Sequence, residues 1–141
     1  MGQAQEPTVT SDVPSVLSIL ICDYVILEAG TNKKTLVGVF DSVNTTQLPV
    51  FQRLGFYARL TDMLGKYRFK IRIVVLDEEE QLVGGLETNE IEATDRLAIM
   101  ELALNLPPLP LTKTGRYEFQ LFANDIYVGR AAISVNQREV R

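Results

Sequence analysis

The sequence contains no histidine and no tryptophan, and it has a single cysteine, Cys22. Without histidine, the chain cannot by itself build a Ser-His-Asp or Cys-His catalytic group, or a histidine-ligated zinc, copper or iron site. One cysteine also excludes an internal disulfide, a thiolate zinc site and an iron–sulfur cluster made by this chain alone. We therefore expect a protein that is not an enzyme and that holds no cofactor and no metal.

Long apolar runs are also missing, since no stretch approaches the roughly 18 residues that a transmembrane helix needs. The first residues lack the basic segment of a signal peptide, and Cys22 follows apolar neighbours as a small core side chain would. A lone thiol favours a reducing compartment, so we expect a cytoplasmic protein without membrane contact. The 14 basic and 18 acidic residues give a net charge of −4, which argues against a nucleic-acid surface.

Residues 115–135, GRYEFQLFANDIYVGRAAISV, carry the clearest structural pattern. Large apolar residues alternate there with polar ones, namely Tyr117, Phe119 and Leu121 with Glu118 and Gln120 between them. This period of two predicts a strand with one face in a core and the other toward water. Asn124 and Asp125 tolerate left-handed backbone, so they predict the turn of a hairpin.

The register of this hairpin depends on the length of its loop. A two-residue turn at Asn124-Asp125 would pair Phe119 with Arg130. A loop one residue longer places large side chains opposite small ones on one face, which favours burial of that face, and we prefer it. The preferred pairs are Leu121 with Gly129, Phe119 with Ala131, and Tyr117 with Ile133.

Further strand-like segments recur at a spacing of about ten residues, at 15–28, 35–43, 55–61, 66–76 and 82–86. In residues 66–76 every second side chain is predicted to face a core, namely Tyr67, Phe69, Ile71, Ile73 and Val75. On the opposite face Val74 and Leu76 are apolar, which predicts that this face is partly covered by a strand or a partner. Residues 62–65 are expected to close a hairpin. Residues 95–106 suit helix or strand, and we prefer strand because the run is apolar on every face and lies among strands. Residues 107–111, PPLPL, are then an extended crossover between sheets.

These segments predict an all-β fold, a two-sheet antiparallel β-sandwich of about eight strands, immunoglobulin-like or C2-like. Residues 1–14 contain Pro7 and Pro14, and we expect them to form a mobile arm. We expect residues 15–136 to form the sandwich domain and residues 137–141 to form a frayed tail.

The segment CDYVILEAGTNKKTLVGVFD, residues 22–41, resembles an uncharacterised bacterial family of short proteins. Members of that family look like CDY-V-x-EAGTNK followed by GxFD, a YARLT segment matched at residues 57–61, and a late GxYxFxL hairpin matched at residues 115–121. The resemblance covers nearly all of the chain after the first fifteen residues. Asn124-Asp125-Ile126 departs from the Asp-Gly expected there. The resemblance implies a small β domain and transfers no catalytic residue.

Five polar residues cluster around one predicted hairpin within this segment, namely Asp23, Glu28, Asn32, Lys33 and Asp41. They are our candidate binding hairpin. The plainer interpretation is that they fix the turn, with Asn32 in left-handed backbone.

Three functions stay open. The first is a protein-interaction or scaffold module that binds a protein partner or a further copy of itself, with no clear small-molecule ligand. The second is a ligand- or cation-binding sandwich that uses acidic loops, because calcium needs six to eight oxygen ligands; its residues would be Asp23, Asp41, Asp62, Asp77 and Asp125. The third is a carboxylate-based enzyme, which needs a pocket with perturbed groups.

Overall fold

The computed structural model describes residues 12–139. Within this range the chain forms strands joined by turns and irregular segments, and it forms no helix. The eleven strands are β1 (Ser15–Leu27), β2 (Lys34–Val39), β3 (Ser42–Thr45), β4 (Val50–Thr61), β5 (Gly65–Tyr67), β6 (Phe69–Leu76), β7 (Glu80–Glu87), β8 (Ile91–Ala93), β9 (Met100–Leu111), β10 (Gly115–Ala123) and β11 (Ile126–Gln137). Three of them, β3, β5 and β8, have four residues or fewer, which leaves the eight longer strands that the sequence predicts.

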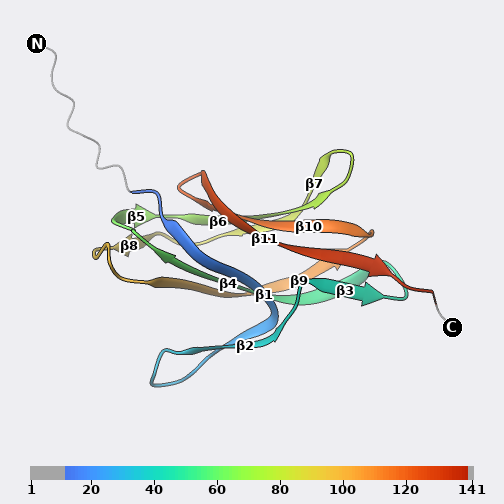
Figure 1. Cartoon of the computed structure of the whole chain (residues 1–141), viewed down its shortest axis with the longest axis horizontal. Helices are drawn as coiled ribbons and strands as arrows, with labels where there is room; N and C mark the ends of the chain where they lie inside the picture. The colour runs from blue at the N-terminus through green and yellow to red at the C-terminus, as the bar shows by residue number, and fades with distance from the viewer. Residues whose placement is uncertain (1–11, 140–141) are drawn as a thin grey trace, which may run out of the picture.

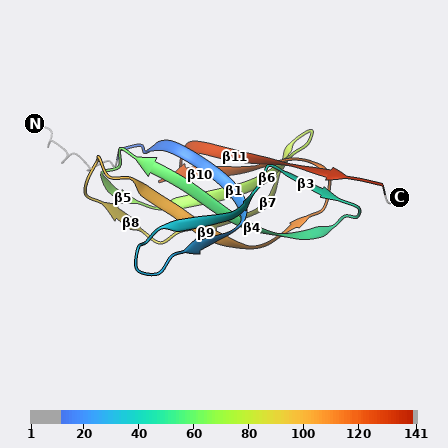
Figure 2. The ribbon, with the colours of Figure 1, turned by 60° about the horizontal axis from the view of Figure 1, so that its bottom comes forward.

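The strands form two packed sheets, as Figures 1 and 2 show. The first sheet has the order β2-β1-β4-β9 and the second the order β3-β11-β10-β6-β7, while β5 and β8 form a small pair of their own. All pairs are antiparallel except β3 with β11, which is parallel. The all-β sandwich predicted from the sequence is therefore confirmed.

The core lies between the inner faces of the two sheets. The alternating set of residues 66–76 is buried as predicted, and it meets the inner face of β10 and the inner face of β4. The central members are Tyr67, Phe69, Ile71, Ile73, Val75, Tyr117, Phe119, Leu121, Leu54, Phe56 and Leu60, each at most 4% exposed. Burial of one such side chain contributes roughly 1.5–3 kcal/mol to the free energy of folding, so this layer dominates stability.

The β10–β11 hairpin has the predicted register, with Leu121 opposite Gly129 and Phe119 opposite Ala131. The predicted longer loop is wrong. Asn124 and Asp125 form a two-residue turn with φ of 49° and 66°, values typical of a type I′ hairpin turn. A register shift between Leu121 and Phe122 places one extra residue in β11, and this bulge provides the large-to-small pairing.

Two predicted connections differ in the structure. Residues 62–65 do not close a hairpin, because β4 pairs with β1 and β9 whereas β6 pairs with β10 and β7 in the other sheet. Residues 107–111 belong to β9 instead of forming a separate crossover, and Pro110 lies opposite Phe51. Since β9 is an edge strand, a missing proline N–H on its open side breaks no ladder bond.

The strand predicted for residues 95–106 begins later than expected. Asp95 starts a turn. Its carboxylate accepts a hydrogen bond from the Leu97 N–H at 2.9 Å, and its main-chain carbonyl accepts one from the Ala98 N–H at 3.2 Å. Strand β9 follows from Met100.

Most of the predicted N-terminal arm lies outside the described residues. Asp12, inside them, accepts a hydrogen bond from the Tyr67 hydroxyl at 2.6 Å and pairs with Arg96. At the other end, Arg138 donates its N–H to the Thr45 carbonyl at 2.8 Å. The domain limits themselves stay predictions.

Candidate functional site

The end of β1 and the whole of β2 leave the first sheet and form a separate layer. β1 pairs with β4 from Ser15 to Cys22, and beyond this point it pairs with β2 alone, as far as Leu27. Figures 1 and 2 show this hairpin folded back along the outer face of the sheet. We call residues 23–39 the hairpin layer. It contains most of the segment that carries the family resemblance.

Gly55 lets the layer approach the sheet. A Cβ at this position would lie 2.8 Å from the Cys22 Sγ, a distance that real Cβ atoms essentially never show, and 3.0 Å from the Tyr24 Cα, which is also tight. Cys22 is fully buried, as the sequence indicates, and its thiol donates to the Gly55 carbonyl. Burial, and then the Asp23 carboxylate, raise the pKa of the Cys22 thiol, so this sulfur is a packing group.

Asn105 on β9 holds the open edge of β1 in the layer. Its Oδ1 accepts from the Val25 N–H at 2.8 Å, and its Nδ2 donates to the Val25 carbonyl at 2.9 Å. One side-chain amide thus replaces the neighbouring strand that β1 loses after Cys22.

An ion pair fixes the start of β2 against the sheet. The Lys34 Nζ lies 3.0 Å from the Glu101 Oε1, and the Tyr57 hydroxyl donates to the other oxygen of this carboxylate. The hydrogen bond from Tyr57, together with Lys34, lowers the pKa of Glu101. Burial and the same hydrogen bond raise the pKa of Tyr57 to about 12, so the phenol stays protonated at neutral pH.

The tip of the layer is a turn with two left-handed residues, Gly30 at φ 87° and Asn32 at φ 60°, and the second was predicted. The Glu28 N–H donates to the Lys33 carbonyl at 2.7 Å, and the Lys34 Nζ donates to the Asn32 carbonyl at 3.1 Å. The polar residues at the tip therefore have a role in shaping the turn.

The five predicted site residues are only partly brought together. Glu28, Asn32 and Lys33 share the tip of the layer. Asp23 lies at its base, and Asp41 lies beyond it, where its carbonyl accepts from the Ser134 N–H of the second sheet. The set marks out the layer from end to end and does not form one polar pocket.

Asp23 requires the glycine opposite to it. A Cβ on Gly38 would lie 2.3 Å from the Asp23 Oδ2, and Gly38 has a φ of 66°. Gly38 is thus a point of close packing, and the β1–β2 register keeps the same offset on both sides of it.

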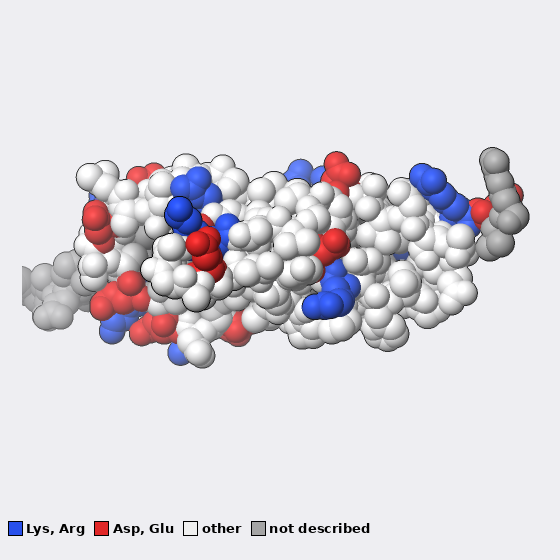
Figure 3. Space-filling view, turned by 90° about the horizontal axis from the view of Figure 1, so that it is seen from below, with Lys and Arg blue, Asp and Glu red and all other residues white. Residues whose placement is uncertain are grey.

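Large apolar side chains that no sequence pattern singles out are exposed on the layer and beside it. They are Leu20, Tyr24, Ile26, Leu27, Val39 and Phe51, and Phe51 is 70% exposed. The Arg53 guanidinium lies 5.9 Å from the centre of the Tyr24 ring, within cation–π range. Figure 3, which views this side of the molecule, shows mostly uncharged atoms with charged side chains in a few separate groups.

Shallow depressions flank the layer at three places, two of them beside Leu20 and Phe51. One, of about 390 Å³, is lined by Asp23, Tyr24, Phe51, Gln52 and Arg53. The other, of about 360 Å³, lies between β1, the end of β2 and β11, and includes Leu20, Val39 and Asp41. Both combine apolar side chains with one or two charges, the composition of a protein-binding surface.

Comparison with known proteins decides the family. The model of DUF6941, described as a family of unknown function, matches residues 17–136. The chain belongs to DUF6941. No curated protein matches its sequence. Within the described part of this DUF6941 chain, no helix has the length and apolarity needed to cross a membrane.

Three of the five acidic loop residues of this DUF6941 chain are each paired with a different side chain. Asp62 accepts from the Ser15 hydroxyl at 2.7 Å, the Asp77 carboxylate lies 2.8 Å from the Lys113 Nζ, and Asp125 lies 3.6 Å from the Lys70 Nζ. Among residues 12–139, no group of three or more acidic or cysteine side chains is placed to hold a metal ion.

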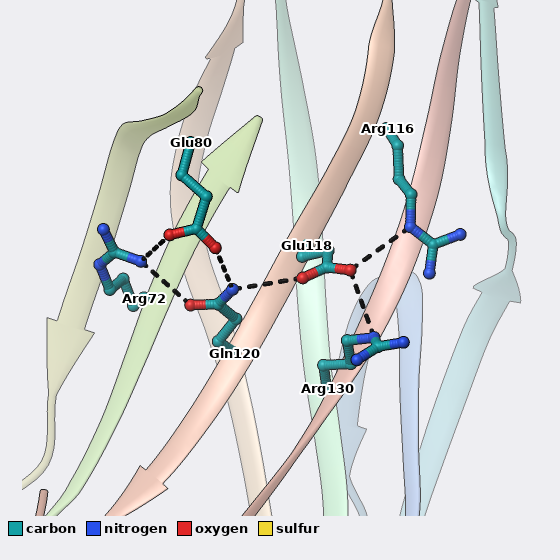
Figure 4. A network of polar contacts seen from close by, with 6 residues as sticks. All are labelled: Arg72, Glu80, Arg116, Glu118, Gln120 and Arg130. Atoms are coloured by element: carbon teal, nitrogen blue, oxygen red, sulfur yellow. Dashed lines mark hydrogen bonds and ion pairs between the residues drawn. The ribbon is translucent and has the colours of Figure 1, made fainter. Parts of the chain in front are cut away.

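A polar network covers the outer face of the second sheet (Figure 4). Glu118 and Gln120, which the alternation predicts to face water, are each only 8% exposed. The Glu118 Oε2 lies 3.2 Å from the Arg130 Nε and 3.4 Å from the Arg116 Nε, while its other oxygen accepts from the Gln120 amide at 3.2 Å. The prediction fails because arginine side chains contact these positions, Arg116 and Arg130 at Glu118 and Arg72 at Gln120.

The same network extends to the β6–β7 hairpin. Gln120 also donates to Glu80 at 3.1 Å, and Arg72 donates to Glu80 at 3.0 Å and to Gln120 at 3.2 Å. Val74 and Glu118 are paired neighbours, and Val74 is fully buried on this outer face. Side chains of the domain itself provide the cover that the sequence predicts there, so we assign the network to stability.

Proposed function

We propose that this DUF6941 chain is a non-enzymatic protein-interaction module, and that its hairpin layer is the docking surface. The observation that carries the proposal is the row of exposed apolar side chains on and beside the layer, with Tyr24, Arg53 and Phe51 around one depression. Tyrosine and arginine are the residue types that most often dominate binding energy at protein interfaces.

The chemistry of the layer supports a role without catalysis. The groups with the most nucleophilic potential, Cys22 and Tyr57, lie under the layer, and both have raised pKa values. A protonated thiol and a protonated phenol are weak nucleophiles at neutral pH. No observation favours the alternative of a cation site in the acidic loops, because several of these carboxylates already pair with a lysine or a hydroxyl. The reduced thiol suits the cytoplasm, where we place the module.

The proposal is tested by site-specific photocrosslinking in the cells that make the protein. A photoreactive phenylalanine analogue replaces Phe51 in one strain and Leu97 in another. Leu97 is the matched control, because it is also apolar and exposed but lies in the turn before β9. We expect a defined protein adduct from position 51 and none from position 97.

A substitution then links the adduct to the surface. Tyr24→Ser should weaken binding about tenfold or more and lower the yield at position 51, while Leu97→Ser should not. Thermal unfolding of both variants checks that the fold is kept. Equal adducts from both positions, or no adduct from position 51, would contradict the proposal.

A further inference from the structure

The hairpin layer buries very little of its own surface. Among residues 23–39 only Val25 is buried, and every residue of the tip is exposed. Residues 54–58 of β4, in the sheet that the layer covers, are all buried. Figure 1 shows the tip of the layer outside the two packed sheets. A segment with few buried apolar contacts opens at a lower free energy than the core does.

A few side-chain contacts attach the layer to the sheet. Beyond Cys22, β1 forms a ladder with β2 alone, and β2 forms one with β1 alone. The polar attachments are the Asn105 amide at Val25 and the ion pair between Lys34 and Glu101. A two-stranded hairpin is at best marginally stable alone in water, so loss of these attachments should unfold the layer as one unit.

The chain on either side of the layer is held by other bonds. On one side, β1 pairs with β4 up to Cys22. On the other, the Phe40 N–H donates to the Ile21 carbonyl at 3.0 Å, and the Asp41 carbonyl accepts from the Ser134 N–H at 2.9 Å. None of these bonds includes a residue of the layer, so the two sheets can stay packed when the layer opens.

The Cys22 thiol lies directly beneath the first residues of the layer. Its Sγ donates to the Tyr24 carbonyl at 3.4 Å. The space that a Gly55 Cβ would take is bordered by this sulfur, by the Tyr24 Cα and by the Val25 Cγ2. Because Gly55 has no side chain, Tyr24 and Val25 cover the fully buried sulfur on the outer face of the sheet.

We propose that the hairpin layer opens as one unit while the two sheets stay packed, and that this opening exposes the Cys22 thiol. Tyr24 belongs to the layer, so opening also takes apart the surface proposed for docking and gives the protein a state that cannot dock. The inference goes beyond the proposed function, and its test needs no partner.

The test is the rate at which Cys22 of the native chain reacts with an aromatic disulfide reagent, measured over a range of urea concentrations. Cys22 is the only thiol of the chain, so the reaction reports one position. We expect the rate without urea to be roughly tenfold or more above the rate that global unfolding allows. The rate should depend weakly on urea, because local opening exposes little surface.

Two variants should make the layer open more often. Asn105→Ala removes two hydrogen bonds that exist only when the layer is closed, so it should raise the rate of Cys22 roughly 5- to 100-fold. Lys34→Gln removes the ion pair and should raise the rate by a smaller factor. This second variant keeps the test decisive if Asn105→Ala does not fold.

Asn124→Gly is the matched control. The Asn124 amide accepts from the Arg68 N–H at 2.9 Å and donates to the Lys66 carbonyl at 3.0 Å, in the second sheet and away from the layer. Glycine keeps the φ of 49° at this turn. The variant should lower the free energy of global unfolding and leave the rate of Cys22 without urea unchanged.

Two results would overturn the inference. In one, Cys22 of the native chain reacts only as fast as global unfolding allows. In the other, Asn124→Gly accelerates the reaction as much as Asn105→Ala does, so that the layer opens only with the whole domain. Either result would leave the proposed function standing, because the adduct from position 51 tests that function separately.

Discussion

Replacement of Asn105 is the sharpest test of how the hairpin layer is held. The amide accepts from the Val25 N–H and donates to the Val25 carbonyl, at 2.8 and 2.9 Å. Asn105→Ala removes both contacts. Asn105→Asp keeps the size and the acceptor but loses the donor, so a carboxylate oxygen comes to face a carbonyl oxygen.

The magnitude follows from the number and burial of these bonds. Each net hydrogen bond contributes about 0.5–1.5 kcal/mol, and an unpaired, partly buried main-chain group costs about 1–3 kcal/mol. We expect Asn105→Ala to lower the free energy of unfolding by about 1–3 kcal/mol. Asn105→Asp should cost at least as much at pH 7, because repulsion replaces the lost bond to Val25.

The two variants should differ in their response to pH. The carbonyl beside the new carboxyl favours its protonated form, so the pKa in the folded state is raised above the value of about 3.9 in the unfolded chain. Above the pKa of the new carboxyl in the folded state, the full loss of stability caused by its charge is present. This loss disappears as the pH falls below the pKa of the unfolded chain, because the protonated carboxyl can again donate to the Val25 carbonyl. The loss caused by Asn105→Ala should not change with pH in this way.

Urea unfolding at several pH values between about 4 and 7 measures both losses relative to the native chain. Hydrogen exchange at the Val25 N–H reports whether the layer itself opens. If Asn105→Asp were as stable as the native chain at pH 7, or if its deficit grew on acidification, the assigned role of the amide would be wrong.

Three further outcomes follow from local geometry. Gly55→Ala should lower the free energy of unfolding by about 1–3 kcal/mol through overpacking against the layer, whereas Gly84→Ala, with nothing closer than 3.4 Å, should be near neutral in the same urea titration. Because the pKa of Tyr57 is raised to about 12, its contribution to the free energy of unfolding is fully present below about pH 10 and is lost as pH rises through 12. Tyr57→Phe should therefore reduce the loss of stability at alkaline pH, and an unchanged dependence of stability on pH would contradict this. Asp125→Gly should raise stability by about 0.5–1 kcal/mol, because glycine adopts φ 66° without strain, and a lower melting temperature would count against the type I′ assignment.

Alternation made the sandwich and the β10–β11 register predictable. Burial of one face constrains every second residue, which favours Ala131 over Arg130 opposite Phe119, and the structure has this pair. The loop itself was mispredicted, because a bulge in β11 has the same effect on register as a longer turn. Residues 62–65 were mispredicted for a related reason, since a turn sequence does not state whether the next strand joins the same sheet or the opposite one.

The hairpin layer could be located from the sequence but its attachment could not. Gly55 and Asn105 lie far along the chain from residues 23–39, and a glycine or an asparagine in a strand has many ordinary explanations. The exposed aromatic Phe51 was missed because the strand predicted at residues 55–61 starts later than β4, which begins at Val50.

The residues that attach the layer are distinct from those that it displays. Val25 and Lys34 face the sheet and are held by Asn105 and Glu101, while Tyr24 points to solvent. This division follows from the period of two along a strand, in which neighbours occupy opposite faces. Substitutions at displayed positions should therefore change binding with little effect on the fold, and substitutions at attaching positions should change stability first. The two classes of variant separate docking from folding, which a surface formed by core residues could not do.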